Sequence, residues 1–68
     1  MNRYEMELWK YENGARLVPT VIDNSRQLAV CEMKCDGGSA NPYAPTLAEA
    51  VNLALRIVNF LNSQPEVD

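Results

Sequence analysis

The fold is decided by residues 4–23, which read YEMELWKYENGARLVPTVID. Apolar and charged side chains alternate on both sides of Asn13-Gly14, which is typical of half-buried strands. An Asn-Gly pair between two such runs favours a type I′ turn, because both central positions of that turn need a positive φ. The expected strands are 4–12 and 16–23. Their expected partners are Glu12 with Ala15, Lys10 with Leu17, Leu8 with Pro19, and Met6 with Val21.

This register predicts two distinct sheet faces, because successive side chains of a strand point to opposite sides. One face would carry Tyr4, Met6, Leu8, Leu17, Pro19 and Val21. The other would carry Glu5, Glu7, Trp9, Tyr11, Val18, Thr20 and Ile22. Pro19 has no N–H to donate, so we expect it at a position without a ladder bond or at a bulge.

A third strand is expected over 27–35, after a turn at 23–26. A turn that is one residue longer or shorter would exchange its two faces. We favour an even-length turn, because Leu28 and Val30 then join the Met6 face and form the better core pair. Cys31 and Met33 would in that case lie on the Trp9 face.

A helix follows a loop at 36–45. Thr46-Leu47-Ala48-Glu49 has the pattern of a capping box, and Pro65 prevents a helix beyond Gln64. The helix is therefore expected over 47–62, with a tail at 63–68. We predict one α+β domain spanning 1–68, a three-stranded antiparallel meander followed by one C-terminal helix on one sheet face (βββα).

The apolar surface of this helix is wider than one sheet can cover. Its polar residues fall on one stripe, namely Glu49, Asn52, Arg56, Asn59 and Ser63. The apolar arc spans roughly 220°, against the ~100° stripe of a helix that lies on a single layer. The remainder could meet the long loop, a second copy of the chain, or another partner. The residues expected to contact a partner are Trp9, Tyr11, Tyr43, Leu55 and Phe60.

The composition argues against several classes of protein. The chain has 68 residues with net charge −3 and scattered basic residues, which disfavours nucleic-acid binding. It has no histidine, so the commonest general base and metal ligand is missing, and we expect no enzyme, cofactor or metal. Cys31 and Cys35 would lie about 13 Å apart on a strand, too far for a disulfide. With no apolar run that could span a bilayer and no apolar signal core, reduced thiols indicate the cytoplasm.

Two local resemblances concern the helix. The run Thr46-Leu47-Ala48-Glu49-Ala50, with Ala54-Leu55, is similar to the helix that follows the sheet in HicB-like antitoxin domains. The Pro-Gly-Cys segment of that family is absent here, so its function is not carried over. Residues 44–50, with Leu53-Ala54-Leu55, also resemble the end of phage proteins built as helix, three strands and helix, although their first helix is missing here. That likeness covers about a third of the chain, and it implies a small phage or prophage accessory protein.

The expected function is a non-catalytic protein–protein interaction module, a homodimer or other homo-oligomer of the phage accessory or inhibitor type. It would act by binding a host macromolecule, for example a host protein. The alternative is a small nucleic-acid-binding or antitoxin-like regulator. That alternative requires Arg3, Arg16, Arg26 and Lys34 to converge in space.

Overall fold

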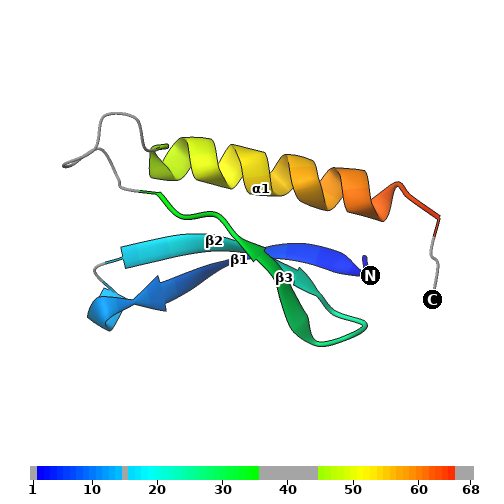
Figure 1. Ribbon diagram of the computed structural model, residues 1–68, viewed down its shortest axis with the longest axis horizontal. Coiled ribbons are helices and arrows are strands. Elements are labelled where there is room, and N and C mark those ends of the chain that lie inside the picture. The colour runs from blue at the N-terminus through cyan, green and yellow to red at the C-terminus, as the bar shows by residue number, and fades with distance from the viewer. Residues whose placement is uncertain (1, 15, 36–44, 66–68) are drawn as a thin grey trace.

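The computed structural model describes residues 2–14, 16–35 and 45–65. Its elements are β1 (Tyr4–Tyr11), the short 3-10 turn η1 (Glu12–Gly14), β2 (Arg16–Asp23), β3 (Leu28–Glu32) and α1 (Leu47–Asn62). The strands form one antiparallel sheet in the order β1-β2-β3, and α1 lies along one face of it (Figure 1). This confirms the predicted βββα fold. Tyr43 and most of the predicted loop and tail lie outside the described residues.

The first hairpin has the predicted register. Its pairs include Lys10 with Leu17, Leu8 with Pro19, and Met6 with Val21. Asn13 and Gly14 have φ of 57° and 87°, the positive values that an Asn-Gly turn accommodates. Glu12 also has a positive φ, 54°, which is uncommon for a residue with a side chain. The strand therefore ends at Tyr11, one residue earlier than expected.

Pro19 is tolerated in the central strand because of where its nitrogen points. The Met33 N–H donates to the Pro19 carbonyl over 2.8 Å, so the backbone of Pro19 faces β3 and not β1. Its missing N–H thus costs the β1–β2 ladder no bond. It does remove a donor for β3, and the β2–β3 pairing ends one residue before Met33.

The predicted even-length turn is present, since Leu28 lies opposite Asp23, but the predicted faces of Cys31 and Met33 were wrong. Cys31 lies opposite Val21, but Ile22 lies opposite Ala29, so Val30 is an extra residue in a β-bulge. Cys31 and Met33 therefore pack against the core under α1, whereas Leu28 and Val30 are exposed. A turn-length argument could not reveal this, because a bulge changes the alternation inside the strand. The strand is also shorter than the predicted 27–35.

Two sets of hydrogen bonds fix the ends of α1. At its start, the Glu49 N–H donates to Thr46 Oγ1 and the Thr46 N–H donates to Glu49 Oε1, which confirms the predicted capping box. The bonds that the Thr46 N–H and hydroxyl donate to the Glu49 carboxylate hold the pKa of Glu49 below its usual value. At its end, the Asn62 amide receives the Tyr4 N–H and donates to the Tyr4 carbonyl, both over 3.0 Å. Asn62 thereby satisfies the outward-facing backbone groups of Tyr4, at the start of β1, as a neighbouring strand would.

The core of the described residues is made of small side chains. The helix contributes Ala50, Ala54 and Val58, and the sheet contributes Val21 on the face below them. Small residues let α1 approach β1 and β2 closely, and α1 makes no close backbone contact with β3. Seven larger apolar side chains lie at the surface of the described residues instead.

Candidate protein-binding surfaces

The sheet face away from α1, here called the Trp9 face, carries both aromatic residues predicted for it. The Trp9 indole N–H donates to Glu7 over 3.1 Å, so the ring extends along β1. Thr20, the residue opposite Glu7, is fully buried and bonds its own strand through Val18. Burial of Thr20 on a face with no second layer is consistent with cover from the neighbouring long side chains. The Trp9 face is therefore partly closed by its own residues.

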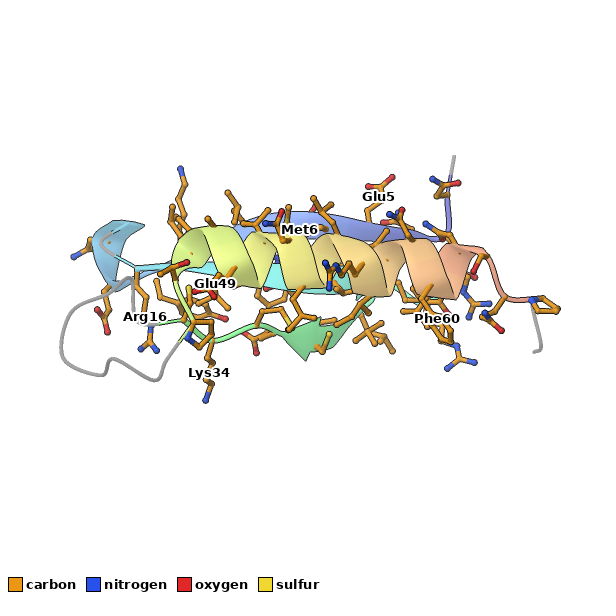
Figure 2. All side chains as sticks on the ribbon, turned by 90° about the horizontal axis from the view of Figure 1, so that it is seen from above. Glu5, Met6, Arg16, Lys34, Glu49 and Phe60 are labelled. Atoms are coloured by element: carbon orange, nitrogen blue, oxygen red, sulfur yellow. The ribbon has the colours of Figure 1, made fainter. Side chains whose placement is uncertain are left out.

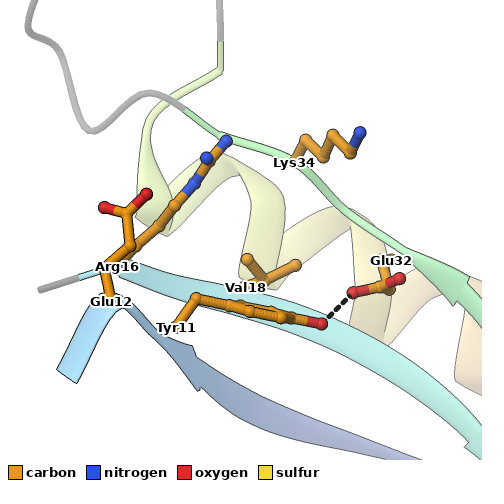
Figure 3. A pocket seen from close by; sticks show the side chains of 6 residues that line it. All are labelled: Tyr11, Glu12, Arg16, Val18, Glu32 and Lys34. Carbon is orange, nitrogen blue, oxygen red and sulfur yellow. Dashed lines mark hydrogen bonds between the residues drawn. The ribbon is translucent and has the colours of Figure 1, made fainter. Parts of the chain in front are cut away.

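Tyr11 shapes one end of the Trp9 face. Its hydroxyl reaches across the sheet and donates to the carboxylate of Glu32, so its ring lies beside Val18 (Figure 3). That bond is the main reason why the pKa of Tyr11 is raised. An open hollow of about 390 Å³ lies at this end. Its lining residues are Tyr11, Glu12, Arg16, Val18, Glu32 and Lys34.

A second hollow lies toward the other end of the sheet, beside the indole. Its volume is about 290 Å³, and its lining is mainly apolar. The lining residues are Trp9, Ile22, Asp23, Asn24, Gln27, Leu28 and Ala29. Hollows flanked by Trp and Tyr are suited to anchoring side chains of a partner, because both residues combine a large apolar body with a polar tip.

The turn at this second end is held by a charged cluster around Asp23. Arg3 binds the Asp23 carboxylate through two nitrogens, at 3.0 and 3.1 Å. The bond from Arg3 is the main reason why the pKa of Asp23 lies below its usual value. Arg26 lies 3.9 Å from the same carboxylate. The cluster is explained by structure, because it satisfies a carboxylate that is only 3 % exposed.

A second surface, here called the α1–β3 side, is defined by Leu28, Val30, Leu53 and Phe60. Each exposes between 44 % and 62 % of its surface, and Phe60 is the most exposed of them. Figure 2 shows Phe60 on the β3 side of α1, with Met6 and Glu5 on the β1 side. At 100° per residue, Leu53 falls on the same side of the helix as Phe60.

The same end of the molecule holds both Phe60 and Leu28. Asn62 bonds Tyr4, Tyr4 pairs with Asp23, and Asp23 pairs with Leu28. The helix then runs back along β3 in the opposite direction, so Leu53 lies further along the same side. Leu53 and Phe60 therefore border the open space between the helix and a strand that it does not cover, and Leu28 and Val30 are exposed on that strand.

The structure separates the residues predicted to contact a partner. Trp9 and Tyr11 share the Trp9 face, whereas Phe60 lies on the α1–β3 side. Leu55 is exposed on the opposite side of α1, toward β1. Viewed down the helix axis, it lies close to Asn62. Tyr43 is not among the described residues. The five predicted residues therefore do not form one surface.

Sequence reasoning missed Leu28, Val30 and Leu53. The helical arc was apolar on both sides, so it gave no signal that distinguished Leu53 from its buried neighbours. The bulge that exposes Val30 has no local sequence signature. Small Ala50 and Ala54, four residues apart, were the available clue to the buried stripe, since close packing needs small side chains.

Across residues 2–14, 16–35 and 45–65, no group of three or more His, Cys, Asp or Glu side chains is placed to hold a metal ion. No helix in those ranges combines the length and apolar character needed to cross a bilayer. Cys31 and Cys35 are free thiols. No protein-family model, curated protein or solved structure matches the chain.

Proposed function

We propose that this chain is a non-catalytic interaction protein that binds another protein through its Trp9 face. The observation that carries the proposal is the open Trp9 face, which has a hollow beside each of its two aromatic residues. The distribution of side-chain size supports association more generally. Seven large apolar residues are exposed within the described parts of the chain, and Tyr11 is the one that lies on the Trp9 face, while the buried apolar residues there are valine, alanine and proline. Large apolar side chains gathered on the surface of a small domain are typical of contact surfaces.

The Trp9 face fits a protein target for two further reasons. It has no second layer over it, and hollows of about 390 and 290 Å³ flank its two aromatic residues. Tyr and Trp are enriched at the centres of protein interfaces, where they act as anchors. Each hollow also has polar groups at its rim, such as Arg16 and Asn24, which can orient a bound side chain.

Binding of nucleic acid is the weaker alternative. It needs the basic residues to converge, but Arg3 and Arg26 both lie at Asp23, at one end of β2. Arg16 begins the same strand, about 23 Å away for an extended segment of this length. Two separated pairs of cations in a chain of net charge −3 give no continuous basic surface.

The proposal also includes a more specific role, which is binding to a host protein. The likeness of residues 44–55 to phage accessory proteins favours a host protein as the target, and this likeness alone supports it. The free thiols of Cys31 and Cys35 favour a reducing compartment such as the cytoplasm.

The test begins with affinity capture from a lysate of the host cell, followed by purification of the captured protein. Calorimetry then compares its affinity for the wild type and for Tyr11→Ala. We expect the substitution to weaken binding at least about tenfold, because interface aromatic residues are frequent hot spots.

Lys10→Ala is the matched control, since Lys10 is the preceding exposed residue of β1 and points to the opposite face. It should leave the affinity within about twofold, as expected for a residue outside the interface. Equal affinities for the wild type and Tyr11→Ala, with both folded, would contradict a target site on the Trp9 face. Tyr11→Phe keeps the aromatic ring but removes the hydroxyl that donates to Glu32, so it distinguishes the contribution of the ring from that of the hydroxyl.

A further inference from the structure

We infer that two copies of this chain pack together through their α1–β3 sides, related by a two-fold axis. This surface shares Leu28 with the hollow beside Trp9, but its other defining residues lie outside the Trp9 hollows on which the proposed function rests, and Leu28 is not used in either test. Failure of one proposal therefore leaves the other intact, and the two are tested with different variants.

The α1–β3 side is open because the helix is centred over β1 and β2. The half-buried residues beneath this side, Cys31, Met33, Ile57 and Leu61, already pack on the core. Around them Leu28, Val30, Leu53 and Phe60 remain exposed to water. The α1–β3 side thus has half-buried apolar residues at its base and exposed apolar residues around them. Nothing in the described chain covers the exposed residues.

Addition of a strand does not account for this surface. Asn62 already occupies the backbone groups of Tyr4 at the edge of β1, where charged side chains also alternate. The other edge, β3, is interrupted by the bulge at Val30. Charged edges and bulges both discourage pairing with a further strand. The α1–β3 side is therefore suited to contacts between side chains.

A second copy fits this side by charge. Each chain carries a net charge of −3, so two copies repel each other over most of their surface. None of the four defining residues is charged, which makes this a surface on which like-charged copies can approach. In a two-fold contact the same patch meets itself, so the apolar side chains of one copy face those of the other, while Glu49 and Arg56, which fall beside Leu53 and Phe60 on α1, lie at the margin of the contact.

The exposed apolar area supplies part of what a dimer interface needs. The four side chains together expose on the order of 400 Å², about half of the ~800 Å² that each partner buries in a standard interface. The half-buried residues Cys31, Met33, Ile57 and Leu61 supply a further part of the contact area. A 68-residue chain with a core of valine and alanine also gains most from such burial, because small domains are often stabilised by self-association.

The chain offers a matched pair of variants for the test, Leu53→Glu and Leu55→Glu. Both leucines are on α1 and have similar exposure, 47 % and 42 %, but they lie on opposite sides of the helix. Sedimentation equilibrium of the full chain should give a monomer–dimer equilibrium for the wild type. Leu53→Glu should raise the dimer dissociation constant at least about tenfold, and Leu55→Glu by less than about threefold.

Circular dichroism checks that each variant is folded. If Leu53→Glu unfolds the chain, Phe60→Glu takes its place, because Phe60 is 62 % exposed and its substitution removes little of the core. Tyr11→Ala should dimerise like the wild type. A wild type that is monomeric at high micromolar concentration would overturn the inference. Equal loss of the dimer in both leucine variants would overturn it as well.

Discussion

Asp23 holds the turn between β2 and β3 through four hydrogen bonds. Two come from the Arg3 side chain, and the other two come from the backbone N–H groups of Ser25 and Arg26. All four favour the ionised carboxylate, which is why its pKa in the folded chain lies below the unfolded value of about 3.9. The folded state therefore binds this proton less readily than the unfolded state.

The pH dependence follows from that difference. Asp23 contributes stability that is fully present above about pH 4, and this stability is lost as the pH falls through the depressed pKa of the folded state. Asp23→Asn should remove this part of the acid sensitivity and lower the melting temperature by several degrees at neutral pH. Thermal unfolding from neutral to acidic pH measures both effects. Glu5→Gln, an exposed carboxylate on β1, is the control and should retain the wild-type acid sensitivity.

At the scale of elements, Asn62 joins the two ends of the chain. One side chain on the last turn of α1 satisfies both backbone groups of Tyr4, 58 residues away in sequence. It also fixes which end of α1 lies over the start of β1. The position of the α1–β3 side depends on this connection, because it sets Phe60 beside the β2–β3 turn.

Asn62→Ala should lower the free energy of unfolding by about 1–2 kcal/mol, because two net hydrogen bonds are lost. Asn59→Ala removes the same amide from an exposed position of the same helix, and it should change the stability by no more than about 0.5 kcal/mol. Both variants share the gain in helix propensity. The difference between them, measured by urea unfolding, isolates the two bonds to Tyr4. Equal values would contradict this role of Asn62.

The same scale shows what the sequence can predict. The Asn13-Gly14 turn and the Thr46–Glu49 capping box act locally, and both the first hairpin and the helix were predicted from them. The face of β3 was not fully predicted, because the bulge at Val30 changes the alternation inside the strand and no local residue pattern marks it. Candidate contact residues on α1 could be recognised as apolar, but only the tertiary position of the helix separates Leu53 and Phe60 from Leu55.

At the scale of the whole molecule, a thin core and an apolar surface have one cause. Ala50 and Ala54 allow α1 to sit close to β1 and β2, and a single helix in that position leaves β3 without cover. The large side chains that would fill a thicker core therefore lie outside. We expect this surface to be covered by association, with the α1–β3 side used for a second copy and the Trp9 face for a target.

Hydroxyl-radical footprinting of the wild-type chain at low and high micromolar concentration tests this claim most directly, with oxidation of Phe60 compared with that of Leu55. The account predicts that Phe60 is oxidised rapidly in dilute protein and becomes protected as the concentration rises, while Leu55 stays equally reactive. Phe60 that is already protected in dilute, monomeric protein would contradict the account, because its own chain would then cover the ring.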